Sequence, residues 1–127
     1  MDEQQHHEEL IKGITEQMKP VLEQSGQAIY IYLDDNHKVC NKKFAELLGY
    51  KSPKEWADAE APLSDIVEGD QQSVIDAYMN ASEKMVASAI EVRAKNVKTG
   101  KIVKIRMIVA PVAYAGHVFT AHFFSKI

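Results

Sequence analysis

Histidine, cysteine and carboxylate side chains are where this sequence could carry chemistry. His6 and His7 stand next to Glu8 and Glu9, and imidazole and carboxylate groups so close together can chelate a metal ion weakly. Because nothing in the sequence tethers this N-terminus, we expect a solvated tail there and no metal site. Cys40 is the only cysteine, which excludes an internal disulfide and a cysteine zinc cluster and favours a reducing compartment, the cytoplasm.

Motifs of catalysis are absent from the sequence. It contains no nucleophile elbow, phosphate-binding loop or kinase signature, and carboxylates such as Asp34, Asp35 and Asp70 fall at expected caps and turns. His117 is the one polar side chain that we place on an inward, apolar strand face. We therefore predict that the protein is not an enzyme. The alternative is a small cavity enzyme of the isomerase or hydratase type that uses His117 with a nearby carboxylate.

Length, composition and charge narrow the class of protein. The chain has 127 residues, of which 46% are hydrophobic and 26% charged, so we expect one folded domain. The formal net charge of −3 gives no general attraction to nucleic acid or to an anionic membrane. The longest nearly apolar run, MIVAPVAYAG, is far shorter than the roughly 20 residues of a membrane span. We predict neither a nucleic-acid partner nor a membrane partner.

The first part of the chain predicts a helix followed by a β-hairpin. Residues 8–24 repeat apolar side chains at every fourth position, which is typical of an amphipathic helix. Residues 27–40 alternate isoleucine with tyrosine and then pass through the polar turn DDNH into a short returning strand.

Helix caps organise the middle of the chain. Asn41 is placed to cap a helix that ends before Gly49, a residue suited to a left-handed backbone. Ser52 and Glu55 form a capping box around a second short helix, and Asp70 is expected to cap a longer one.

The last part of the chain predicts three strands. Apolar and charged residues alternate over 90–95 and 103–109, and Gly100 between them suits a hairpin turn. The final strand, from residue 117, carries large side chains on both faces. Strands, then helices, then strands predict an α+β fold, in which helices pack on an antiparallel sheet.

This layout and three motifs resemble the PAS domain family. AIYIYLDDNHKVCNKKFAELLGY resembles the first hairpin of the family with its Asn and its helix ending in Gly-Tyr; LSDIVEGD resembles the segment before the central helix, and KTGKIVKIRM a later hairpin. The resemblance implies a five-stranded antiparallel sheet in the order 2-1-5-4-3, with short helices on one face. We divide the chain into an N-terminal flanking helix over 1–24, whose first residues we expect to be disordered, and a PAS domain over 25–127.

The resemblance also implies a sensory or signalling module. Such a module holds a small ligand or cofactor in a cavity between sheet and helices, forms a homodimer, and passes its signal to a partner such as a kinase or regulator. A purely structural dimerisation module with a solid core is a further alternative. From strand and helix phase we expect the cavity to be lined by Ile31, Phe44, Leu48, Trp56, Ile66, Tyr78, Val92, Ile105, Met107 and Phe119.

The identity of the cofactor stays open. Flavin-based light sensors of the family carry a cysteine in the helical region, whereas Cys40 falls on a strand, so covalent flavin photochemistry is disfavoured. Haem-binding members commonly use a histidine of the helical segment, and residues 71–85 contain none. Haem and non-covalent flavin remain minor alternatives.

The opposite face of the sheet is expected to be partly apolar. The helix over 8–24 would cover it, either within one subunit or by pairing with a second copy. A basic cluster is expected to be a solvated outer surface, with an acidic partner as the functional alternative. The apolar residues predicted for the opposite face are Tyr30, Tyr32, Ile102, Ile108, Val118 and Phe124, and the basic cluster is Arg93, Lys95, Lys98, Lys101, Lys104 and Arg106.

Overall fold

The computed structural model describes residues 3–59 and 62–127, apart from the side chain of Gln4. The helices and strands follow the predicted order, but the first helix begins at Glu3, before the predicted start at residue 8. No helix in the described ranges is long and apolar enough to cross a membrane. The elements are α1 (Glu3–Gln24), β1 (Ala28–Asp34), β2 (His37–Cys40), α2 (Lys42–Leu48), α3 (Pro53–Asp58), two 3₁₀ turns (Pro62–Asp65 and Glu68–Asp70), α4 (Gln71–Lys84), β3 (Ser88–Lys95), β4 (Ile102–Tyr114) and β5 (His117–Lys126).

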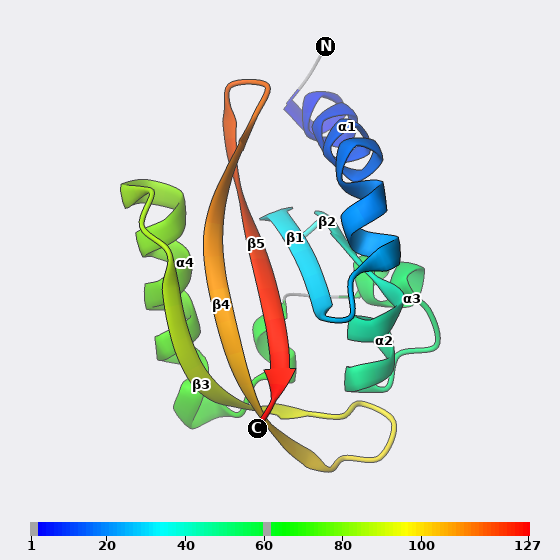
Figure 1. Cartoon of the computed structure of the whole chain (residues 1–127), viewed down its shortest axis with the longest axis vertical. Helices are drawn as coiled ribbons and strands as arrows, with labels where there is room; N and C mark the ends of the chain where they lie inside the picture. Colours follow the sequence, from blue (N-terminus) through cyan, green and yellow to red (C-terminus); the bar gives the residue numbers. More distant parts are fainter. Residues whose placement is uncertain (1–2, 60–61) are drawn as a thin grey trace.

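The strands form a five-stranded antiparallel sheet in the order β2-β1-β5-β4-β3, which confirms the predicted order (Figure 1). The central pair is β1 and β5. Ile29 lies opposite Phe123, and Ile31 lies opposite Ala121. Because these two strands are far apart in the sequence, the middle of the sheet forms only when the first and last strands meet.

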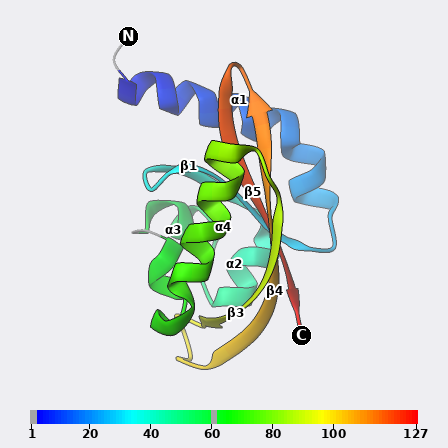
Figure 2. The ribbon, with the colours of Figure 1, turned by 90° about the vertical axis from the view of Figure 1, so that its left-hand side faces the viewer.

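Different helices cover the two faces of the sheet. α2, α3 and α4 lie on one face, where α4 runs alongside β3 (Figure 2). On the other face α1 packs mainly against β2 and β1, and its Leu10 and Ile14 belong to the same buried cluster as Ile29 and Phe119. Since β1 is covered on both sides, residues 28–31 are all buried.

This arrangement corrects the predicted phase of β1 and β5. Tyr30, Tyr32 and Phe124 face α2–α4 and not the opposite side. Ile31 and Phe119 instead lie beneath α1. Both strands carry apolar residues on both faces, so alternation alone does not show which face meets which layer. On β4, where charged residues mark the solvent side, the predicted phase is right and Ile108 is exposed.

The start of α4 also differs from the prediction. Asp70 occupies the N-cap position, but its side chain does not cap the helix. Its carboxylate instead accepts hydrogen bonds from the backbone N–H of Arg93 at 2.8 Å and from the guanidinium group at 2.9 Å. Asp70 therefore ties the beginning of α4 to β3.

Asn41 joins β1 to α2, and its predicted role as a helix cap is confirmed. Its Oδ1 accepts hydrogen bonds from the backbone N–H of Phe44 at 3.0 Å and of Ile29 at 3.1 Å. Its Nδ2 donates to the carbonyl of Gln27 at 2.8 Å. One buried amide thus satisfies three backbone groups from two elements.

Asn41→Ala should lower the free energy of unfolding by about 2–4 kcal/mol, because a helix cap and two further buried backbone groups lose their partner. Ser52→Ala is the matched control, since Ser52 caps α3 through a single hydrogen bond from the N–H of Glu55 at 3.1 Å. That control should cost about 1 kcal/mol. Urea unfolding measures both, and equal losses would contradict the linking role of Asn41.

Candidate functional site

A cavity of about 230 Å³ lies between the sheet and the helical layer. Its walls come from β1, β3, β4, β5, α2 and α4, and from the turns that precede α4. Most lining side chains are apolar or aromatic, with a few polar groups among them, as is typical of small-molecule sites. The lining residues are Tyr30, Tyr32, Asp35, Phe44, Leu48, Pro62, Leu63, Asp65, Ile66, Val74, Ile75, Tyr78, Ala94, Ile105, Met107, His122 and Phe124.

Most of the residues predicted for the cavity lie in its wall or next to it. Trp56 and Val92 belong to the same buried core but do not line the cavity. Ile31 and Phe119 were wrongly placed, because they lie on the opposite face of the sheet under α1. The predicted residues that do line it are Phe44, Leu48, Ile66, Tyr78, Ile105 and Met107.

His122 is the one histidine among the described residues of the cavity wall, and sequence reasoning did not place it there. Its ring stacks on Tyr30, with the ring centroids 4.0 Å apart, and its Nε2 lies 2.9 Å from Oγ1 of Thr120. Its Nδ1 is buried and has no hydrogen-bond partner within the described structure. Burial lowers the pKa of His122 to about 3, so the imidazole is neutral at pH 7. A neutral ring nitrogen without a partner can donate to or accept from a bound molecule.

Asp65 and Tyr50 form a polar pair at the helical side of the cavity. The Tyr50 hydroxyl lies 2.9 Å and 2.8 Å from the two carboxylate oxygens of Asp65, to which it donates. Burial raises the pKa of Asp65 above its usual range, and the hydrogen bond from Tyr50 offsets only part of that effect. Asp65 thereby forms a polar part of the cavity wall.

Lys38 holds the hairpin and α3 together beside this site. Its Nζ donates to the backbone carbonyls of Asp35 at 2.6 Å, Ala57 at 3.0 Å and Ala59 at 2.9 Å. It also lies 5.3 Å from the ring centroid of Trp56, within cation–π range. A buried lysine with three carbonyl partners is not predicted from the sequence, because two of those partners, Ala57 and Ala59, lie 19 and 21 residues away.

The histidine proposed for catalysis lies elsewhere. His117 does not line the cavity, and its Nε2 is 3.0 Å from Nε2 of His6 on α1. His7 is 2.8 Å from a carboxylate oxygen of Asp34. The prediction of a solvated tail around His6 and His7 is thus wrong, because the chain is already helical there and both side chains have partners.

Cys40 and the basic cluster occupy ordinary positions. Cys40 is buried, and burial raises the pKa of its thiol to about 12, so the sulfur behaves as a small apolar group. All six residues of the basic cluster are exposed. Two of them pair with acids, Arg93 with Asp70 and Arg106 with Glu91.

Comparison with known proteins identifies the fold. No family model matches the chain, and no curated protein matches it in sequence. A PAS domain from a two-component sensor histidine kinase shares 14% identity over 91% of this chain and 98% of that chain, with a TM-score of 0.66. A PAS domain from Colwellia psychrerythraea shares 20% sequence identity over 90% of this chain and 97% of that chain, with a TM-score of 0.69. A LOV protein from Rhodobacter sphaeroides shares 16% sequence identity over 100% of this chain and 69% of that chain, with a TM-score of 0.68. The chain therefore has the PAS fold, which confirms the resemblance noted in the sequence.

The burial of His122 predicts a pH dependence of stability. Its pKa is about 3 in the folded protein and about 6.5 in an unfolded chain, so between these values only the unfolded state takes up the proton. The free energy of unfolding should fall as the pH drops below about 6.5, and by pH 4.5 the loss from this residue should be about 2–3 kcal/mol.

The measurement is urea unfolding of wild type, His122→Phe and His122→Leu between pH 7.5 and pH 4.5, at pH values spaced by about one unit. Both variants lack the titrating group, so their stability should decline less than that of wild type over this range. Parallel pH profiles in all three proteins would contradict a neutral, buried His122.

Proposed function

We propose that this chain is a non-catalytic sensory module that binds one small, largely apolar molecule in the cavity beneath α2 and α4. The observation that carries the proposal is an apolar cavity of about 230 Å³ with one neutral, partnerless imidazole nitrogen in its wall residue His122. The similar structures include a PAS domain from a sensor histidine kinase and a LOV protein, which supports a signalling role.

The size of the cavity bears on the class of ligand. An engineered cavity of about 150 Å³ binds benzene, whereas drug-sized ligands occupy about 300–1,000 Å³. At about 230 Å³ this cavity suits a molecule of one or two rings, smaller than a flavin or haem. Tyr30, Phe44 and Phe124 offer aromatic contacts to such a ring, and the ring of His122 lies in the same wall.

Replacing a small lining residue by a larger one should fill the cavity and abolish ligand binding. Ala94 is fully buried and lines the cavity from β3, whereas Ala89 on the same strand is exposed. Indole at a free concentration about ten times its Kd should stabilise wild type and Ala89→Leu by about 1.4 kcal/mol. Ala94→Leu should abolish the effect, because leucine takes up the space.

Thermal unfolding with and without indole measures this difference. Native mass spectrometry of the purified wild type, repeated after denaturation, tests for a molecule already bound. A chain mass alone, together with no indole effect on wild type or Ala89→Leu, would contradict the proposal and favour a structural module.

We further propose that the module acts as a homodimer through α1 and the outer face of the sheet, and passes its signal to a partner such as a kinase or regulator. The support is the exposure of two apolar side chains in these regions, Val21 on α1 and Ile108 on β4. Exposed aliphatic side chains of this kind are a common feature of protein contacts.

Light scattering after gel filtration tests the dimer. Wild type should have twice the chain mass of 14.3 kDa. Val21→Glu or Ile108→Glu should give the monomer mass, since a buried, unpaired carboxylate is costly in an interface. Val97→Glu, at an equally exposed apolar residue outside these two surfaces, is the control and should remain dimeric. A monomeric wild type would contradict this part of the proposal.

A further inference from the structure

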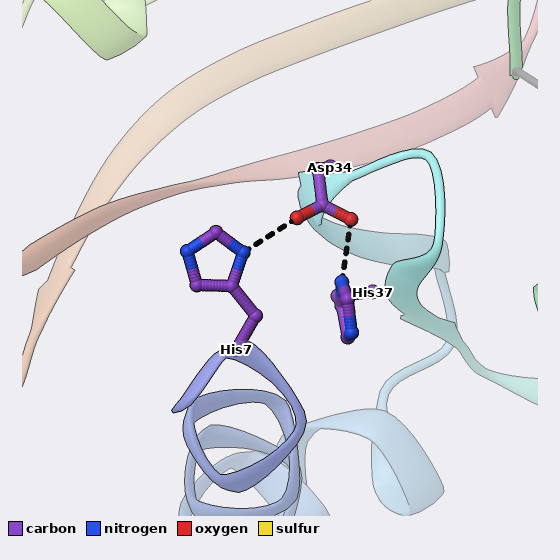
Figure 3. Close-up of side chains that lie close together, drawn as sticks. All are labelled: His7, Asp34 and His37. Atoms are coloured by element: carbon purple, nitrogen blue, oxygen red, sulfur yellow. Dashed lines mark hydrogen bonds and ion pairs between the residues drawn. The ribbon is translucent and has the colours of Figure 1, made fainter. Parts of the chain in front are cut away.

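Four of the five histidines gather where the start of α1 meets the β1–β2 turn and the beginning of β5. His6 contacts His117. Next to this pair, Asp34 lies between two imidazoles: its Oδ2 is 2.8 Å from Nδ1 of His7, and its Oδ1 is 2.6 Å from Nδ1 of His37 (Figure 3). The three residues come from α1, the end of β1 and the start of β2.

We propose that His7, Asp34 and His37 bind a divalent transition-metal ion of the Zn²⁺ class. One potential ligand atom from each residue lies within 4.8 Å of the others. Ligand atoms around a tetrahedral zinc ion are about 3.3 Å apart, given bonds of roughly 2.0–2.1 Å. Small side-chain rotations therefore convert the hydrogen-bonded triad into a ligand set, with water in the fourth position.

The chemistry of the donors selects the class of ion. Two of the three are imidazoles, which suit zinc, nickel, copper and cobalt, while calcium and magnesium prefer oxygen ligands alone. The carboxylate supplies the negative charge. Its two oxygens already lie beside the two imidazoles, with Oδ2 2.8 Å from Nδ1 of His7 and Oδ1 2.6 Å from Nδ1 of His37.

The surroundings allow an ion to enter a site that is already partly ordered. The N–H of Asn36 donates to Asp34 Oδ1 at 3.0 Å, which orients the carboxylate. His37 is buried, with its side chain 3% exposed, and is held on the hairpin. The side chains of His7 and Asp34 are 21% and 38% exposed, so solvent reaches the open side of the triad.

Metal binding would fix the start of α1. Residues 8 and 9 are exposed, and the buried apolar side chains of α1 begin at Leu10. His7 therefore precedes the part of α1 that packs on the sheet. An ion shared by His7, Asp34 and His37 would join the first turns of α1 to the β1–β2 hairpin more firmly than the hydrogen bonds alone, because it binds all three groups at once.

The test is titration of the metal-free chain with Zn²⁺ at pH 7.5, on the order of one unit above the ordinary imidazole pKa, by isothermal calorimetry. Wild type should bind one ion per chain. His7→Gln and Asp34→Asn should each weaken binding by about tenfold or more, since each removes a ligand. Mg²⁺ in place of Zn²⁺ should not bind. Hydrogen exchange should show slower exchange in α1 when Zn²⁺ is added to wild type.

Residues outside the triad provide matched controls. His6→Gln, one position away, and Asp76→Asn, at an exposed position on α4, make the same chemical changes and leave the triad intact, so Zn²⁺ affinity should stay within about threefold of wild type. His37→Gln is secondary, because His37 is buried and its loss also affects folding. Absence of binding by wild type, or equal losses in His6→Gln and Asp76→Asn, would overturn the proposal.

Discussion

The pairing of β1 with β5 is the constraint on which the rest of this structure depends. β5 is the central strand of the sheet and β1 is its neighbour, although β1 is the first strand in the sequence and β5 the last. Each is covered on both faces, so neighbouring residues of one strand serve two different cores: Tyr30 packs with α2 and α3, and Ile31 lies in the cluster under α1. Because apolar side chains on both faces must be buried together, these two strands contribute to the core under the helical layer and to the core under α1.

The helical layer leaves space that a solid core would fill. α2 and α3 have only seven and six residues. Both are stabilised by their N-caps, and α3 also by the hydrogen bonds from Lys38. Short helices cannot present a long continuous apolar stripe, so part of the sheet stays uncovered between them and α4. His122 lies in that space. A buried imidazole with one unsatisfied nitrogen costs stability.

Sequence reasoning succeeded where the signal is local. Asn41, Gly49 and Ser52 act at the predicted helix ends, and Ile105 and Met107 face inward because charged neighbours on β4 mark the outer face. It failed where the answer depends on a partner far away in the chain. Nothing local distinguishes the two apolar faces of β1 and β5, so Ile31 and Phe119 were assigned to the wrong layer. His122 was missed for the same reason, and the meeting of His7 with Asp34 requires α1 to have docked on the sheet.

The two candidate sites meet at the turn that follows β1. Tyr32 and Asp35 both line the cavity, and the Tyr32 hydroxyl donates to the carboxylate of Asp35. Asp34, the last residue of β1, lies within hydrogen-bonding distance of His7 of α1 and His37 of β2. A molecule that shifts Tyr32 in the cavity wall therefore acts on a turn that already contacts the start of α1. An ion bound at Asp34 would restrain the same turn, and any effect of one site on the affinity of the other would be reciprocal and equal.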